Sequence, residues 1–276
     1  MSRVEDRVMK LLKIASCMAE NTEPFCRALA CYIQIKIGIE TEYVGGIPWQ
    51  ERERMFDAGE IQMLWLCGLP YVHKAELLRT QVELLAVPVP IGRRYENRPV
   101  YFSDVVVHRK SPYRCFSDLR GRVWAFNEPR SHSGYNVVRA HLAGLGAYAG
   151  YFASAVESGA HVNSLRMILD RRVDCAAIDS TVLEWAAQEQ PEISEHLRVI
   201  ETLGPSPIPP WVISKSVPAH RRRTIRALLL DMHRDTFGMV ALNEGRIARF
   251  VASNDHDYDP IRRMAQAAAA VALQPA

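Results

Sequence analysis

The stretch "VWAFNEPRSHSGYNVVRAHL", residues 123–142, runs from an apolar segment through a polar loop into apolar residues at helical spacing. This order is typical of a β-strand that leads into an α-helix. Ser131 and Ser133 stand directly before the helical pattern, with Gly134 behind them. Serine is a favoured helix cap, but two hydroxyls beside unpaired backbone N–H groups also predict a seat for an anion.

The same strand-to-helix order recurs on both sides of this stretch. Short apolar runs predict strands at 11–18, 39–46, 61–68, 82–90, 99–109, 117–129, 151–159 and 173–179. Amphipathic runs predict helices at 22–38, 49–59, 69–80, 131–146, 161–172, 180–190, 220–235 and 261–273. Alternation of this kind predicts an α/β fold with parallel pairing of strands.

The alternation of strands and helices restarts after "VYFSDVVVHR" (100–109). The proline-rich "GPSPIPPW" (204–211) marks the point where we expect the chain to return to the first lobe. We therefore expect two lobes: residues 1–104 together with 205–276, and an inserted lobe of residues 105–204. In open α/β sheets, ligands lie beyond the carboxyl ends of the strands, where helices begin. The expected ligand site is a cleft between the two lobes.

Composition narrows the possible partners. Lysine and arginine number 34 against 31 acidic residues, a net charge of +3 that does not suggest a nucleic-acid surface. The basic run 220–226 is interpreted as the solvated start of a helix. No apolar segment reaches the ~18 residues that a membrane span needs. The first twenty residues show no export signal, so we expect a cytoplasmic protein, or a periplasmic one if the true start lies upstream.

The six cysteines form no C-x-x-C pair and no zinc-binding spacing. Most of them lie in apolar runs, so we expect buried, free thiols. The acidic loop "NDHDYDP" (254–260) lacks the glycine and terminal glutamate of an EF-hand and is interpreted as solvated. No catalytic or nucleotide-binding motif stands out. We expect no metal and no cofactor.

Four further loops join a strand to a helix: "AENTEP" (19–24), "CGLPYV" (67–72), "ESGAHVNS" (157–164) and "AIDST" (177–181). The third places His161 at a helix start, where the helix dipole favours negative charge. In the fourth, Thr181 and Glu184 fit a capping box. Gly134 in the opening stretch would let a ligand approach the backbone closely.

Several stretches resemble one protein family. "FSDLRGRVWAFNEPRSHSGYNVVRAHL" (116–142) and "VESGAHVNSLRMILDRRVDCAAIDS" (156–180) resemble the S-x-S-G-Y and G-x-H regions of phosphonate, phosphite and phosphate-binding proteins of ABC importers. "GEIQMLWLCGLPYV" (59–72) resembles the family's strand and turn ending in tyrosine. The resemblance covers nearly the whole chain in the right order. It implies a two-lobed type II periplasmic-binding-protein fold with a two-strand hinge.

The resemblance also implies roles for individual residues. Ser131, Ser133 and the backbone around Gly134 would hold the oxyanion, and His161 would contact it from a second helix start. Asp179, with Tyr71, would reach the variable end of the ligand, such as an amine on a phosphonate.

His132 replaces the threonine that is usual in the family, which leaves the ligand's identity open. The ligand-binding residues that we predict are Thr22, Tyr71, Ser131, His132, Ser133, Gly134, Tyr135, His161 and Asp179.

Three functions remain open at this point. The first is a binding protein for a small oxyanion, phosphate or a phosphonate, with an ABC permease as partner if the protein is exported. The second is a cytoplasmic enzyme on the same fold, similar to those of menaquinone or thiamine-pyrimidine synthesis. Its acid or base would have to be His132, His161 or Asp179. The third, a ligand-sensing domain, is disfavoured because no DNA-binding helix-turn-helix is appended. We expect a binding protein rather than an enzyme.

Overall fold

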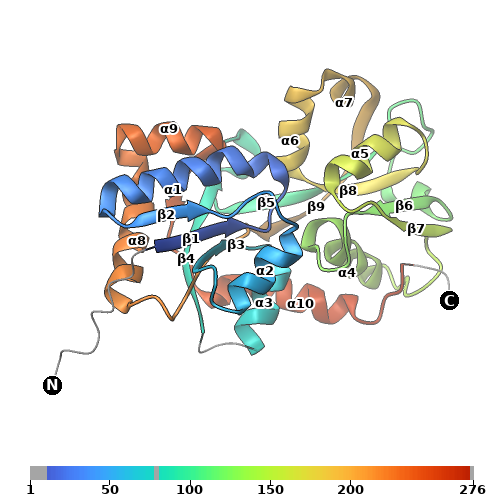
Figure 1. Cartoon of the computed structure of the whole chain (residues 1–276). Helices are drawn as coiled ribbons and strands as arrows, with labels where there is room; N and C mark the ends of the chain where they lie inside the picture. Colours follow the sequence, from blue (N-terminus) through green and yellow to red (C-terminus); the bar gives the residue numbers. More distant parts are fainter. Residues whose placement is uncertain (1–10, 78–80, 274–276) are drawn as a thin grey trace. The chain divides into compact units, whose positions relative to one another are not determined.

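The chain builds two units, each with its own β-sheet and core, as the computed structural model in Figure 1 shows. The structure describes residues 11–77 and 81–273. Unit 1 comprises Met1–Pro99 and Ile208–Asp257, and unit 2 comprises Val100–Pro207 and Tyr258–Ala276. The predicted α/β class is confirmed. Within the described residues, no helix has the length and apolar character needed to cross a bilayer.

The sheet of unit 1 has six strands in the order β11-β4-β10-β3-β1-β2. Their bounds are Leu11–Ser16 (β1), Glu40–Tyr43 (β2), Met63–Trp65 (β3), Val82–Pro90 (β4), Trp211–Ser214 (β10) and Ile247–Val251 (β11). Only β1 pairs in parallel, with β2 and β3, whereas β4, β10 and β11 pair antiparallel. The predicted parallel pairing is confirmed for β1, β2 and β3. The antiparallel pairs involve β10 and β11, neither of which we predicted as a strand.

Five helices belong to unit 1: α1 (Glu23–Ile37), α2 (Trp49–Asp57), α3 (Gly68–Leu77), α8 (Ala219–Asp231) and α9 (Thr236–Glu244). Helix α1 buries Phe25, Leu29 and Ile33, one every four residues, and so turns one face to the core. It begins with Pro24 in its first turn and ends at Gly38, whose left-handed φ of 65° favours glycine. Helix α9 packs beside α1 (Figure 1).

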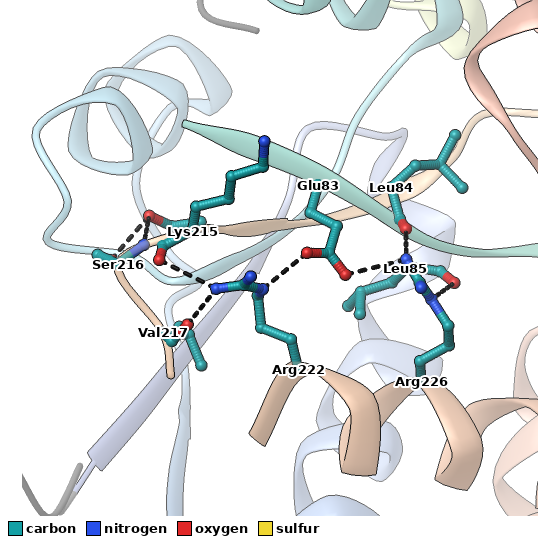
Figure 2. Close-up of polar contacts among 9 residues, drawn as sticks. Glu83, Leu84, Leu85, Lys215, Ser216, Val217, Arg222 and Arg226 are labelled. Carbon is teal, nitrogen blue, oxygen red and sulfur yellow. Dashed lines mark hydrogen bonds and ion pairs between the residues drawn. The ribbon is translucent and has the colours of Figure 1, made fainter. Parts of the chain in front are cut away.

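The basic run 220–226 is only partly solvated, which corrects its interpretation as a solvated helix start. Arg222 Nε lies 2.7 Å from a carboxylate oxygen of Glu83, and Arg226 Nη2 lies 3.0 Å from the other. The two guanidinium groups also donate to backbone carbonyls of the neighbouring strand and turn (Figure 2): Leu84, Leu85, Lys215 and Val217. Glu83 on β4 therefore fixes α8 to the sheet.

Glu83→Gln is expected to lower the free energy of unfolding by about 1–3 kcal/mol, because it removes the charge that two partly buried guanidinium groups share. Asp231→Asn is the matched control, since Asp231 and Arg234 form an exposed pair with side chains 62% and 74% accessible. The control should change the free energy of unfolding by less than about 0.5 kcal/mol. Urea unfolding of both variants checks this, and equal effects would contradict an anchoring role for Glu83.

The sheet of unit 2 has five strands in the order β7-β6-β8-β5-β9. Their bounds are Val100–His108 (β5), Val123–Phe126 (β6), Ser154–Glu157 (β7), Cys175–Asp179 (β8) and Leu197–Pro207 (β9). Strand β6 is parallel to β7 and β8, whereas β5 is antiparallel to β8 and β9. The parallel trio places the loops that follow β6, β7 and β8 at the same edge of the sheet.

The helices of unit 2 are α4 (Val137–Gly144), α5 (His161–Leu169), α6 (Ser180–Glu189), α7 (Pro191–His196) and α10 (Asp259–Ala268). Residues from Tyr258 on were expected in the first lobe but pack in unit 2. The reason is that α10 lies along α4, and Val271 and Leu273 enter the core that includes Val138. Arg139 also donates to the carbonyl of Val271.

Short 3₁₀ turns complete the chain: η1 (Glu20–Thr22), η2 (Arg93–Tyr95), η3 (Phe116–Leu119), η5 (Met232–Arg234) and η6 (Asp255–Tyr258). All six cysteines are free thiols. Only Cys26 and Cys175 are fully buried, whereas Cys31 and Cys115 are exposed, so the expectation of buried cysteines holds for two positions.

Candidate functional site

The loop after β6 enters its helix through a single wide turn, the π-helical segment η4 (His132–Asn136), which continues without a break into α4. Ser131 is the cap of this turn, because its hydroxyl oxygen accepts the backbone N–H of Gly134 at 3.1 Å. The backbone N–H of Asn136 donates to the carbonyl of Ser131 at 3.0 Å. Helix capping is thus the structural role of Ser131, as serine's preference for cap positions predicts.

Ser133 meets His161 at the start of α5. The distance between Ser133 Oγ and His161 Nε2 is 3.0 Å, and the two residues are only 4% and 7% exposed. Ala160, which precedes α5, offers no side-chain cap. The second ring nitrogen, His161 Nδ1, is buried without a hydrogen-bond partner among the described residues. The starts of two helices therefore meet at Ser133 and His161, a pair of side chains that leaves one ring nitrogen without a hydrogen bond among the described residues.

Gly134 packs closely against two neighbouring side chains. A Cβ at this position would lie 2.1 Å from Asn127 Oδ1 and 3.2 Å from His161 Cε1. The space that a side chain at position 134 would need thus holds the side chains of Asn127 and His161. Close approach of a ligand to the backbone at Gly134 stays a prediction. Asn127 Oδ1 is buried and has no partner among the described residues. We call Asn127, Ser131, Ser133, Gly134 and His161 the seat.

His132 points away from the seat. It is fully buried, its Nε2 lies 2.9 Å from Ser206 Oγ on β9, and its Nδ1 lies 3.1 Å from Asn136 Nδ2. An amide nitrogen can only donate, so Nδ1 is the acceptor and Nε2 carries the proton. Because both ring nitrogens already form hydrogen bonds inside unit 2, His132 has no ring nitrogen left to bond a ligand in this geometry. Ser206 and Asn136 were not predicted, because no local pattern points to them.

Burial determines the electrostatics of these residues. It lowers the pKa of His132 to about 3 and that of His161 to about 4, from an ordinary value of 6.5. Both imidazoles are therefore neutral at pH 7. The seat itself contains neither lysine nor arginine, so its donors are neutral side chains and the backbone N–H groups at two helix starts.

Asp179 is the cap of α6 rather than a free carboxylate. Its Oδ1 accepts the backbone N–H of Thr181 at 2.8 Å and the Thr181 hydroxyl at 2.7 Å. The predicted capping box of Thr181 and Glu184 is therefore wrong, because the cap is Asp179, two residues before Thr181, and the helix begins at Ser180. Burial raises the pKa of Asp179 to about 6, although the bonds from Thr181 oppose the shift. Ser103 stands opposite Asp179 on β5.

Tyr135 faces a groove elsewhere on unit 2. Its ring packs on Phe126 at 4.8 Å between centroids, and the Arg139 guanidinium lies over it at 5.0 Å. The groove measures about 570 Å³ and is also lined by residues 269–273. The structure does not bring the Tyr135 ring into contact with the Ser133–His161 pair through any described interaction.

Thr22 and Tyr71 belong to unit 1. The Thr22 hydroxyl donates to the carbonyl of Ala19 at 2.8 Å, one turn before α1. The Tyr71 hydroxyl, on the buried start of α3, donates to Asp255 Oδ1 at 2.9 Å. Both side chains are thus held at strand-to-helix junctions of unit 1. Their part in ligand binding stays a prediction.

In the acidic loop 254–260, Asp257 accepts bonds from Ser253 and Asn254 and closes its own turn. No group of three or more metal-binding side chains occurs among the described residues.

The buried histidines predict a pH dependence. Between about pH 6.5 and 4 the unfolded chain binds protons at His132 and His161 that the folded chain does not, so the free energy of unfolding falls as the pH drops through this window. Asp179 acts oppositely between about pH 6 and its ordinary value of 3.8, and offsets one of the two.

His161→Asn should reduce the slope by up to about 1.4 kcal/mol per pH unit in this window. Urea unfolding at several pH values measures it. The exposed His220 supplies a control, His220→Asn. If both variants kept the wild-type slope, the neutrality of buried His161 would be refuted.

The sequence and the fold were compared with known proteins. The profile of one family, described as ABC transporter, phosphonate, periplasmic substrate-binding protein, matches residues 18–258. The comparison with curated proteins gave no match.

Among solved structures, PhnD1 from Prochlorococcus marinus in complex with methylphosphonate superposes with a TM-score of 0.81 at 15% identity, over 95% of this chain and 99% of that one. A binding protein component of an ABC phosphonate transporter from Pseudomonas aeruginosa gives 0.80 at 17% identity, over 93% and 85%. The aliphatic sulphonate binding protein SsuA from Escherichia coli gives 0.65 at 14% identity, over 93% and 91%. These likenesses confirm the predicted two-lobed type II periplasmic-binding fold.

Proposed function

The chain belongs to the phosphonate substrate-binding proteins of ABC transporters, and from this premise we propose that its seat binds the oxyanion of a phosphonate or of phosphate. Membership implies a small ligand and a permease as partners. The family is described as periplasmic, and the periplasm is the compartment that we propose for this protein.

The contact between Ser133 and His161 carries the proposal. A neutral imidazole has one donor and one acceptor nitrogen. If Nε2 accepts the Ser133 hydroxyl, then Nδ1 carries a proton and has no partner among the described residues. If Nε2 donates instead, the Ser133 hydroxyl proton is left over. In either tautomer one donor remains for an acceptor ligand, as an oxyanion requires.

The surroundings of this pair favour an anion without supplying a fixed positive charge. The start of η4–α4 and the start of α5 both present backbone N–H groups, and the partial positive charge of a helix start attracts anions. Because hydrogen bonds to a charged group are stronger in a buried site, neutral donors suffice there.

Asp179 is the residue that we propose for the variable end of the ligand. Its buried carboxylate has one oxygen bonded to Thr181, and burial raises its pKa because it penalises the charged form. A positive charge beside the carboxylate would stabilise that form. An ammonium group on an aminoalkylphosphonate would supply that charge. Aminomethylphosphonate should therefore lower the pKa of Asp179, whereas methylphosphonate should not.

The alternative of an enzyme finds less support. Ser133 and His161 are at the distance of a nucleophile and its base, but none of the described residues forms the hydrogen bond to His161 Nδ1 that would orient such a base. A histidine with a pKa of about 4 is also a poor proton acceptor near neutral pH.

Titration calorimetry and thermal unfolding with methylphosphonate, aminomethylphosphonate, phosphate and sulfate test the proposal. A ligand at 100 times its dissociation constant should raise the free energy of unfolding by about 2.7 kcal/mol. After incubation with the protein, the phosphorus NMR spectra of the two phosphonates should show no product. Binding of none of the four anions, or turnover of one of them, would overturn the proposal.

A further inference from the structure

The imidazole of His132 joins the first helical turn of the seat to strand β9 inside unit 2. It is completely buried, and so are Ser206 at 1% exposure and Asn136 at 3%. Its Nε2–H donates to Ser206 Oγ at 2.9 Å, and its Nδ1 accepts the side-chain amide of Asn136 at 3.1 Å. The ring centroid also lies 6.4 Å from that of Tyr101, which pairs with Ser206 across the β5–β9 ladder.

These contacts hold both ends of η4. His132 is the first residue of the turn and Asn136 the last, and one ring contacts β9 and Asn136 together. A π-helical turn is rare and needs support from the surrounding structure. Ser133 lies inside this turn, so the position of its hydroxyl depends on how the turn is held. A single hydroxyl at position 132 would be too short to reach both partners.

We propose that His132 is a positioning residue for the oxyanion site: it fixes η4 to β9 through Ser206, and thereby holds Ser133 Oγ at bonding distance from His161. The inference rests on the proposed function. It assigns a task to a residue that does not touch the ligand, and it predicts that a change on β9, outside the seat, alters affinity.

Ser206→Ala is the principal variant, because it removes the partner on β9 and leaves η4 and the seat chemically unchanged. Its dissociation constant for methylphosphonate should rise about five- to tenfold, the value of one buried hydrogen bond. His132→Gln, which can still reach Ser206, should lose less affinity than His132→Asn, which cannot. Ser206→Ala combined with His132→Asn should bind no more weakly than His132→Asn alone, since both break the same contact.

Thr202→Val is the matched control on the same strand. Thr202 donates a hydrogen bond to Asp104 at 2.8 Å and touches neither η4 nor α5 through a described hydrogen bond. Its loss should lower the free energy of unfolding but leave the dissociation constant unchanged. If His132 only stabilises the fold, Ser206→Ala should likewise lower the free energy of unfolding and leave the dissociation constant unchanged. That result would overturn the inference.

Hydrogen exchange separates this inference from the proposed function. The amide of Asn136, which closes η4 onto Ser131, should exchange faster in Ser206→Ala than in wild type, while the amides of α6 keep their rates. If wild type bound none of the four anions, the proposed function would fail, and faster exchange at Asn136 would still support positioning of η4 by His132. Unchanged exchange at Asn136 would overturn the inference whether or not a ligand binds.

Discussion

Replacing Ser131 and Ser133 together with alanine is expected to weaken methylphosphonate binding at least about a hundredfold, because two hydroxyl donors to a charged group are worth roughly 1.5–3 kcal/mol each. The structure divides the effect between them. Ser131 caps η4 through Gly134, so Ser131→Ala alone should lower the free energy of unfolding by about 0.5–2 kcal/mol. Ser133→Ala should act mainly on the dissociation constant, since its partner is His161.

Titration calorimetry and urea unfolding on both single variants and the double variant measure the division. Backbone N–H groups at the helix starts remain in all three, so binding should be weakened rather than lost. Wild-type affinity in Ser133→Ala would remove Ser133 from the site and leave only the capped helix.

Gly134→Ala should damage both the stability of the fold and ligand binding. Its Cβ would lie 2.1 Å from Asn127 Oδ1, closer than any real contact, so either the amide or η4 has to move. Overpacking of this kind costs about 1–3 kcal/mol of unfolding free energy. Because Ser133 is the preceding residue, a shift of η4 should also weaken methylphosphonate binding more than about tenfold.

Two controls accompany this variant. Gly144→Ala, at the end of α4, meets no atom within 4 Å and should be neutral or stabilising by up to about 1 kcal/mol. Asn127→Ala combined with Gly134→Ala removes the clashing amide and should recover part of the lost stability. Lack of any recovery would place the strain somewhere other than between Asn127 and Gly134.

The local features of the site were predictable, because they depend on neighbouring residues. The helix after Ser131 follows from apolar spacing and from serine's capping preference. The start of α5 at His161 follows in the same way. Strands β10 and β11 were missed, since four or five residues flanked by prolines or helices give little periodic signal.

The contacts that define the seat join residues far apart in the sequence, and no local pattern encodes them. The approach of Ser133 to His161 was implied only by the resemblance to a family. The inward direction of His132 depends on Ser206, which lies 74 residues further along the chain. Asn127 stood in the stretch first considered, yet an asparagine in a loop predicts a turn rather than a packed neighbour of Gly134.

After Asp257 the chain leaves unit 1 and enters unit 2 again. This crossing determines the order in which the two cores can be completed during synthesis. The core of unit 1 includes Phe250, and that of unit 2 includes Val271 and Leu273. All five strands of the unit 2 sheet are synthesised before β10 and β11 of unit 1, yet the core of unit 2 is completed after that of unit 1. On a ribosome, part of the apolar surface of the unit 2 strands therefore stays uncovered until Val271 and Leu273 have been synthesised.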